Sequence, residues 1–425
     1  MLPLGLLLLL PAGSGQNAAP QDGCVVCHGE AGQHLLRSVH TQAGVTCVDC
    51  HGGASGPLDP GDPHGPDLRP LTDPRAAVES CGSCHADIER MRPYGRRTDQ
   101  LALYRTSRHG IRLAEGNTDV ATCVSCHGAH EVLTATDPRS PVFRLNQVAT
   151  CGGCHADQEL MARYDLPGSA PAEYRGSAHG RALLELGRSS SPTCSSCHGS
   201  HGALPPRVQA LGQVCGACHG VVREHFEAGP HMAAVRAGQM TECISCHGHH
   251  GVQVPSPELL TGAGEGHCGS CHTAADDPAL AVARDLRAGL ADIDTMLDDT
   301  ARELERAAAR GLFIDREAGY LEEARGLRIQ AGALVHAVSP DALRGLQDRC
   351  RGTIRQTAES LRKQERGLRD RRVFVTVFLL VVLLLAAVLM VYRREIGGGW
   401  GTRPPDAPGS GARPRAPAAE AGPDA

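Results

Sequence analysis

Ser107-Arg108-His109-Gly110, then Cys123-Val124-Ser125-Cys126-His127-Gly128-Ala129-His130, then Cys151-Gly152-Gly153-Cys154-His155 make up the stretch that decides the architecture of this chain. The stretch contains two Cys-x-x-Cys-His pentapeptides, with one further histidine before the first pentapeptide and one just after it. Variants of the same pattern fill most of the sequence up to residue 272. We therefore expect this part of the chain to be built from one recurring element.

The cysteine count points to the chemistry of that element. Of 19 cysteines, all except Cys350 fall in Cys-x-x-Cys-His motifs, which leaves none for a disulfide network. The motif cysteines are Cys24, Cys27, Cys47, Cys50, Cys81, Cys84, Cys123, Cys126, Cys151, Cys154, Cys194, Cys197, Cys215, Cys218, Cys243, Cys246, Cys268 and Cys271. In covalent haem attachment two thiols add to the porphyrin vinyl groups and the adjoining histidine binds the iron. Zinc or iron–sulfur ligation is the alternative, but neither requires histidine at the same offset nine times.

The composition agrees with a core that side chains alone cannot fill. Only 3% of the 425 residues are aromatic, while there are 51 glycines and 28 prolines. Such a chain buries too little apolar surface to offset the entropy lost on folding, and covalent haem would supply the missing core. The net charge of −5 indicates neither nucleic-acid binding nor a polybasic membrane surface.

Residues 21–277 form an internal repeat. After a leading motif, Cys24–His28, four repeats each contain a histidine, a first motif usually followed by Gly-x-His, and a second motif of the form Cys-Gly-x-Cys-His. The segments between motifs are short and rich in glycine and proline. We predict a mainly α-helical and irregular fold with little regular structure and no sizeable sheet, carrying nine covalent haem c groups.

Histidines are the predicted iron ligands. The nine motif histidines are His28, His51, His85, His127, His155, His198, His219, His247 and His272. The repeat nominates eight others as the second axial ligands, namely His40, His64, His109, His130, His179, His201, His231 and His250. In the first repeat Ala54 occupies the Gly-x-His position, so His64 is the expected substitute. Which motif each of these histidines serves stays open.

The ninth haem has no obvious second ligand in the repeat. Its candidates are His34, His225, His249, His267 and His336. We favour His34. His336 lies on a predicted helix far along the chain, and we expect it to be a solvated histidine and not a ligand.

Other residues near the motifs are interpreted structurally. Met91 and Met161 each follow a motif histidine by six residues, too closely for easy axial ligation, and we expect them to pack against a haem face. Tyr104 and Tyr174 occupy equivalent places before Ser-x-His-Gly, which favours packing at a haem edge over catalysis. Cys350 is interpreted as an apolar helix residue.

The chain begins with an apolar run over residues 2–10, followed by small residues, which is typical of a secretory signal although no Lys or Arg precedes the run. We predict a signal peptide over residues 1–20. Haem c is attached outside the cytoplasm in bacteria, so export is required in any case.

From Pro278 the composition changes to Ala, Leu, Arg and Glu. Apolar residues at helical spacing predict an amphipathic helix that Gly311 ends, and a second helix over residues 315–338. The apolar positions of the first helix are Leu286, Leu290, Ile293, Leu297, Ala301, Leu304 and Ala308. Ser339-Pro340-Asp341 is a predicted N-cap with proline at the first helical position. A third helix follows with Leu343, Leu346, Cys350, Ile354 and Leu361 on one face, giving a predicted helical stalk over residues 278–372.

Residues 373–392 contain no charge. Twenty residues at about 1.5 Å each span the roughly 30 Å hydrocarbon layer, so we predict one transmembrane helix. Arginines flank both ends and do not decide its orientation. Because haem attachment is extracytoplasmic, we place the haem domain on the periplasmic side of a bacterial cytoplasmic membrane and residues 393–425 in a disordered cytoplasmic tail.

The nine motifs between residues 24 and 272 resemble those of bacterial membrane-anchored multihaem c-type cytochromes. The likeness is to the doubled-motif proteins related to class III cytochromes c and to the tetrahaem quinol-dehydrogenase cytochromes. It implies electron transfer between a quinol-linked membrane oxidoreductase, such as a cytochrome b-type subunit, and periplasmic redox proteins. Because those quinol-oxidising proteins carry an N-terminal anchor, their quinol site cannot be transferred to this chain.

Two alternatives stay open. One is a reductase or oxidase of small nitrogen or sulfur species with an open iron, either in the irregular first repeat or at Cys24–His28. The other is a haem-bearing docking subunit of a larger membrane respiratory complex.

Overall fold

The structure is a computed structural model that describes residues 23–53, 64–206, 211–262 and 267–397. Helices and loops account for all of these ranges, with no β-strand in them, which confirms the predicted fold class. The predicted signal peptide, Ala54 and the tail beyond residue 397 lie outside the described residues. The chain divides into a first unit, Met1–Met296 with Ala324–Arg351, and a second unit, Leu297–Glu323 with Gly352–Ala425.

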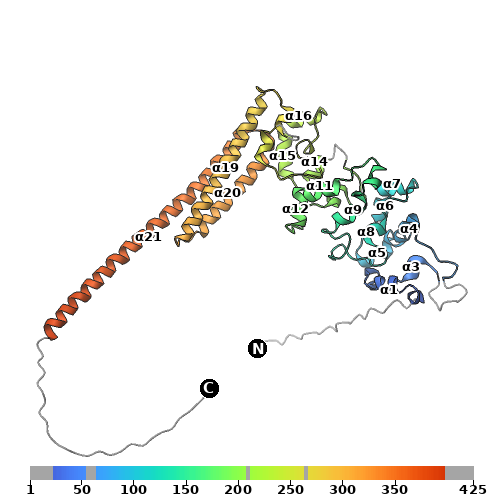
Figure 1. Cartoon of the computed structure of the whole chain (residues 1–425), viewed down its shortest axis with the longest axis horizontal. Coiled ribbons are helices and arrows are strands. Elements are labelled where there is room, and N and C mark those ends of the chain that lie inside the picture. The colour runs from blue at the N-terminus through green and yellow to red at the C-terminus, as the bar shows by residue number, and fades with distance from the viewer. Residues whose placement is uncertain (1–22, 54–63, 207–210, 263–266, 398–425) are drawn as a thin grey trace, which may run out of the picture. The chain divides into compact units, whose positions relative to one another are not determined.

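Short helices joined by loops build the repeats of the first unit (Figure 1). In chain order they are η1 (Gly23–Val26), α1 (Gly29–Leu36), α2 (Val39–Gln42), α3 (Cys47–His51), α4 (Pro74–His85), α5 (Ile88–Met91), η2 (Arg92–Tyr94), α6 (Gln100–Thr106), α7 (Arg108–Ala114), α8 (Cys123–His127), α9 (Gln147–His155), α10 (Gln158–Ala162), α11 (Ala170–Gly176), α12 (Ala178–Leu184), α13 (Cys194–His198), α14 (Leu211–Gly216), α15 (Gly220–Ala228), α16 (His231–Arg236), α17 (Ile244–His247), η4 (Pro257–Leu260) and α18 (Cys268–Cys271). Three long helices follow, namely α19 (Pro278–Ala309), α20 (Asp315–Leu334) and α21 (Pro340–Gly397), with the short η5 (Val335–Ala337) after α20.

The first motif of each of the first three repeats is a single helical turn with its own start and stop. In the second repeat the Thr122 side chain caps the turn, and Ser125 bonds back to the Thr122 backbone N–H at 3.0 Å. Gly128 ends the turn with a φ of +81°, a left-handed conformation that only glycine adopts without strain. The same capping box occurs at Thr46 and Thr193. Gly52 and Gly199, which also have a positive φ, end those two turns in the same way.

The Ser-x-His-Gly element forms a tight turn that requires its serine and its glycine. Ser107 is 1% exposed; its hydroxyl accepts the Gly110 N–H at 3.0 Å and donates to the Tyr104 carbonyl at 2.6 Å. A Cβ on Gly110 would lie 2.0 Å from that carbonyl oxygen. Ser177, in the third repeat, makes the same two bonds. The element thus fixes the backbone on both sides of its histidine.

Tyr104 and Tyr174 tie these elements to the first motif of their own repeats. The Tyr104 hydroxyl donates to the Ala121 carbonyl at 2.9 Å, and the Tyr174 hydroxyl donates to the Pro192 carbonyl at 2.6 Å. Burial raises the pKa of both phenols to about 12, so both stay protonated donors. The tyrosines therefore have a structural role here, and their expected packing at a haem edge stays a prediction.

In the first unit, α19 packs with α20 and the start of α21. Ile293 is 0% exposed and Leu343 1% exposed, and each such side chain contributes about 1.5–3 kcal/mol by burial. Cys350 is also fully buried, as expected of an apolar helix residue. The apolar faces predicted for α19 and for the start of α21 are confirmed as buried at most positions. Ala307 is buried where Ala308 was expected, because the stripe of a long helix drifts around its axis.

The second unit contains the turn between α19 and α20 and the rest of α21. Gly311, with a φ of +85°, ends α19 near the predicted position. Arg310 and Glu365 form an ion pair at 2.8 Å, and the carboxylate of the buried Glu317 accepts from Gln364 at 2.9 Å. These contacts hold the turn against α21.

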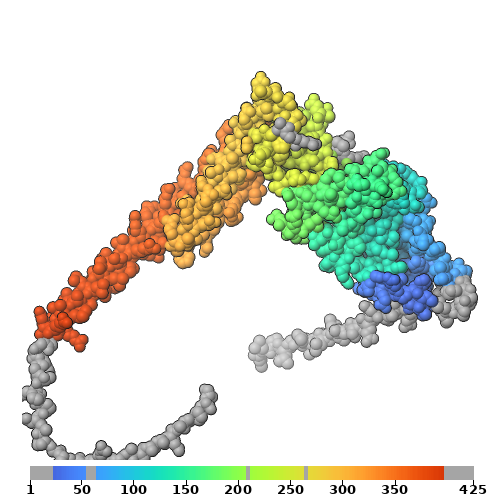
Figure 2. All heavy atoms as spheres, viewed as in Figure 1, coloured from blue at the N-terminus to red at the C-terminus, as the bar shows by residue number. Residues whose placement is uncertain are grey.

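Helix α21 begins at Pro340, as predicted, and its first turn is capped by the Ser339 hydroxyl, which accepts the Ala342 N–H at 3.3 Å. It continues without a break through residues 373–392 to Gly397, so residues 393–397 are helical and not part of a disordered tail. The apolar part is long and hydrophobic enough to cross a membrane, and none of its most apolar window is buried within the described residues (Figure 2).

The tight turn of the third repeat makes a testable prediction. Gly180→Ala places a Cβ 1.9 Å from the Tyr174 carbonyl oxygen, so the free energy of unfolding should fall by about 1–3 kcal/mol, as for overpacking. Thermal unfolding followed by circular dichroism measures this. Gly176→Ala, which meets no atom within 4 Å, is the matched control and should unfold like the parent protein. Equal melting temperatures for the two variants would contradict the close-approach explanation.

Candidate functional site

Nine pairs of imidazole rings face one another in the described part of the first unit. Each pair joins a motif histidine to a histidine outside the motifs, with ring centroids 5.9–6.3 Å apart. The pairs are His28–His64, His40–His85, His51–His130, His109–His155, His127–His201, His179–His219, His198–His250, His231–His272 and His247–His336. All eight non-motif histidines nominated from the repeat lie opposite a motif histidine.

The spacing of these pairs fits a metal ion between the rings. Two imidazoles bound to one metal at about 2.0–2.1 Å each have their ring centres roughly 6 Å apart. The angle between ring planes varies from 8° in His127–His201 to 61° in His40–His85, while the spacing hardly changes. By contrast, the directly touching rings of His249 and His250 are 4.7 Å apart. A constant distance with a free rotation is what a shared central atom imposes.

The second motif of each repeat pairs with the histidine that opens the same repeat. Thus His109 faces His155 at 6.1 Å, and His179 faces His219 at 6.2 Å. The first and fourth repeats follow the same rule. These four pairs are local to their repeats.

The first motif of each of the first three repeats pairs with a histidine of the next repeat. His51 faces His130 at 6.3 Å, and His127 faces His201 at 6.0 Å. His198 of the third repeat faces His250 of the fourth in the same way. Residues 107–155 are therefore not self-sufficient, because His130 serves the preceding repeat. Each boundary between repeats carries one ring pair.

The leading motif follows the same rule. His28 faces His64 of the first repeat at 6.2 Å. His64 thus takes the place of the missing Gly-x-His, as predicted, and its partner is the leading motif. The leading motif, Cys24–His28, was one candidate for an open iron, and its histidine has a second histidine opposite it.

Backbone hydrogen bonds join the repeats beside these pairs. The residue before the opening histidine donates its N–H to the carbonyl two residues beyond the Gly-x-His histidine of the next repeat. Arg108 donates to Ala203 at 3.0 Å and Ala178 donates to Val252 at 2.7 Å. Val39 donates to Val132 in the same way at 2.9 Å. The Gly-x-His segment is therefore held in place by backbone pairing as well as by its histidine.

The fourth repeat has no following repeat, and the helical segment takes that role. Pro230 stands where the earlier repeats have a backbone donor, and it has no N–H to give. Instead η5 packs beside it, with the His336 carbonyl oxygen 2.7 Å from where a Cβ on Gly229 would lie. His336 faces His247 at 6.1 Å. Its Nδ1 lies 3.0 Å from the Ala333 carbonyl, which leaves Nε2 available.

The structure places His336, and not the favoured candidate His34, opposite a motif histidine. His34 lies 3.0 Å from the Glu131 carboxylate, which also accepts from Arg37 at 2.8 Å. The chain folds a distant helix end back onto the last repeat, which proximity in sequence does not predict. The one relevant signal in the sequence is that His336 is the only histidine beyond residue 272. His225 and His249 face no motif histidine among the described ring pairs.

Burial favours the neutral form of several paired rings, which is the form that metal ligation requires. Burial and the facing ring both lower the pKa of His40 and His109. Burial lowers the pKa of His85 and, together with neighbouring rings, that of His127. An unprotonated nitrogen is thus available on each of these four rings at neutral pH. Met91 and Met161 are buried close to their motifs, but histidines face the rings there.

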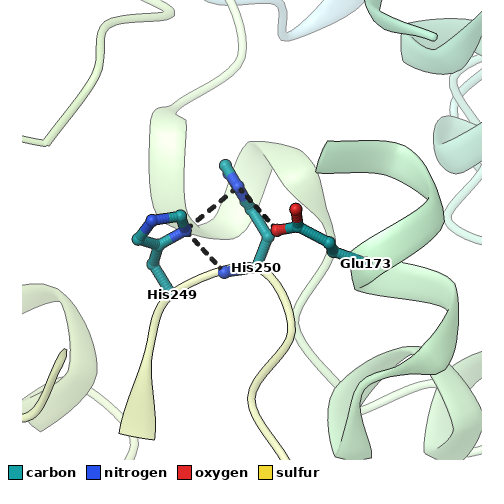
Figure 3. A group of neighbouring side chains, drawn as sticks. All are labelled: Glu173, His249 and His250. Atoms are coloured by element: carbon teal, nitrogen blue, oxygen red, sulfur yellow. Dashed lines mark hydrogen bonds and ion pairs between the residues drawn. The ribbon is translucent and has the colours of Figure 1, made fainter. Parts of the chain in front are cut away.

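One cluster shows how a non-motif ring is oriented (Figure 3). The His249 Nδ1 accepts the backbone N–H of His250 at 2.9 Å, and the His250 Nδ1 lies 3.2 Å from it. The Glu173 carboxylate is 4.0 Å from the same His250 nitrogen. These three side chains have metal-binding donors within 4.8 Å of one another. Because His250 also faces His198, we interpret the cluster as fixing its tautomer, with Nδ1 as donor and Nε2 available.

The motif cysteines of successive motifs are adjacent. Cys81 and Cys123 share a side-chain hydrogen bond, which raises the pKa of Cys81 and lowers that of Cys123. Equivalent bonds join Cys151 to Cys194 and Cys215 to Cys243. Weaker electrostatic contacts link the remaining neighbours, Cys50 with Cys81, Cys126 with Cys154, Cys197 with Cys215 and Cys246 with Cys268. The attachment points from Cys47 to Cys271 thus form a row in chain order.

The comparisons with known proteins agree with this geometry. Residues 39–156 match a family described as cytochrome c3, and residues 233–277 match one described as a doubled CXXCH motif. No curated protein and no solved structure matches the chain. The two matched segments contain six of the motifs described above, whose thiols bind c-type haem covalently. These two matches support a multihaem c-type cytochrome related to the class III cytochromes.

Proposed function

We propose that the protein is a nonahaem electron-transfer cytochrome in which each iron is bound by two histidines. The observation that carries this proposal is the set of nine ring pairs with one common spacing. A haem with two histidine ligands supplies one-electron transfer and offers no open position for substrate. His64 opposite His28 speaks against a substrate-binding iron at the leading motif.

The motif cysteines would hold the haems by thioether bonds, and the motif histidines would be one set of axial ligands. The second axial ligands would be His40, His64, His109, His130, His179, His201, His231, His250 and His336. From Cys47 to Cys271, the attachment points of neighbouring motifs lie close to one another. This arrangement supports electron transfer from motif to motif in chain order.

We further propose that residues 373–392 of α21 anchor the protein in a membrane. Support comes from the length and apolar composition of this part of the helix, and from the absence of buried residues in its most apolar window. Because haem c is attached outside the cytoplasm, the haem array would face the periplasm. A quinol-linked membrane oxidoreductase and periplasmic redox proteins would then be the redox partners.

The ligand proposal predicts which histidines, when removed, open an iron. His336→Ala should convert one haem in nine from low-spin to high-spin, because His247 then has no facing ring. Electron paramagnetic resonance and carbon monoxide binding measure the open iron. His34→Ala, which removes a ring hydrogen-bonded to Glu131, is the control and should stay fully low-spin. High-spin haem in the His34 variant alone would overturn the assignment.

The pairing across repeats makes a second prediction. His130→Ala should open the haem attached at Cys47–His51, in the preceding repeat. In a protein that lacks this attachment through Cys47→Ala and Cys50→Ala, the same substitution should produce no further high-spin haem. In a protein that lacks the Cys123 and Cys126 attachment instead, it should still open one haem. The reverse result would assign His130 to its own repeat.

The membrane proposal is tested by the fractionation of cells that express the full chain. The parent protein should resist extraction with alkaline carbonate. Leu384→Arg, at the centre of the apolar segment, should shift protein to the soluble fraction, because an arginine there costs about 2.5–3.5 kcal/mol of insertion free energy. An extractable parent protein would contradict the anchor.

A further inference from the structure

His272 differs from the other motif histidines in its surroundings. Its Nδ1 lies 2.9 Å from the Asp277 carboxylate. Among the motif histidines of the described residues, no other has a carboxylate within 4.0 Å of its ring nitrogens. The closest comparison is His198, whose Nδ1 lies 3.2 Å from the neutral carbonyl of Leu204.

The Asp277 carboxylate is held in place from both sides. Its Oδ1 accepts the Ala279 N–H at 2.8 Å, which caps the start of α19, and its Oδ2 faces His272. The Asp277 backbone N–H donates to the Ala274 carbonyl at 3.0 Å. Only 23% of the Asp277 side chain and 35% of the His272 side chain are exposed. The acceptor is therefore preorganised and partly shielded from water.

We propose that Asp277 is a positioning residue that lowers the reduction potential of the haem attached at Cys268–His272. The proposal rests on the proposed function, in which His272 binds iron through Nε2. An anionic acceptor on Nδ1–H fixes the ring orientation and makes the imidazole a stronger electron donor. Such a donor stabilises ferric iron more than ferrous iron, so the potential falls. The neutral acceptor on His198 has a weaker effect of the same kind.

Because this haem lies at the end of the row, its lowered reduction potential affects the direction of electron transfer. Cys268 is the attachment of the last motif, and its nearest neighbour in the row is Cys246. The axial ring opposite that neighbouring motif histidine, His336, has the neutral Ala333 carbonyl on its Nδ1. A low potential at the end of the row favours electron transfer from the last haem to the one at Cys243–His247. Asp277 thereby favours one direction of electron transfer at this end of the array.

The test is a redox titration of the full-length haem-loaded protein carrying Asp277→Asn. Asparagine is as good an N-cap as aspartate, so α19 should start normally while the negative charge is lost. One of nine one-electron components should shift, with its ferrous-to-ferric ratio at a fixed potential rising about tenfold, which corresponds to about +59 mV. Asp276→Asn, at the exposed neighbouring residue, is the matched control and should leave every component in place.

Two results would overturn the proposal. One is a titration of the Asp277 variant that coincides with that of the Asp276 variant; the other is an equal shift in both, which would indicate only a change in net charge. If the asparagine variant loses haem, Asp277→Ser keeps the helix cap without the charge. Its redox titration then tests the proposal in the same way. The proposed function is judged separately, because it requires nine low-spin haems in the parent protein whatever the potential of the last one.

Discussion

Two imidazole rings held about 6 Å apart are the constraint on which the rest of the first unit depends. The repeats contain few large apolar side chains, and Leu113, Val148 and Leu183 are among the small number that are buried. Their polar caps and turns are instead arranged so that each histidine meets a partner. Ser107 and Gly110 shape the backbone around one ring, and the helical turn ending at Gly128 directs another toward the preceding repeat. With so small an apolar core, ligation is expected to supply much of the missing long-range stabilisation.

Because the ring pairs join each repeat only to its neighbours, the array is one-dimensional. Such an array needs a capping element at each end. At the amino-terminal end, the leading motif contributes only His28 and uses His64 of the first repeat. At the other end, His336 closes the last ring pair from outside the motifs. The loop after α20 is thus a capping element of the array, and residues 324–351 belong to the same compact unit as the repeats. The predicted division at residue 277 between a haem domain and a stalk stays a prediction, but the ring pairs extend beyond it to His336.

Similar ring pairs differ in the groups that contact Nδ1. His198 and His336 have backbone carbonyls there, His250 has a second imidazole, and His272 has a carboxylate. Under the proposed ligation, these groups would vary the electron-donating strength of each imidazole while the distance to its partner ring stays constant. A multihaem protein with uniform ligation can in this way give its irons different potentials. The variation follows local turns, such as the cap of α19, and not the repeat.

The sequence by itself determined the nine attachment motifs, the repeat, eight of the facing histidines and the long α21, because each follows from residue types at fixed short spacings. It could not determine which histidine faces which motif. His130 and His109 are equally near the motifs of their repeat, and only the folded chain sends one of them to the preceding repeat. It also gave no local reason to choose His336, 89 residues after its partner His247 in the numbering. Such pairings depend on how turns, caps and helix ends bring distant segments together, and only the tertiary structure decided them.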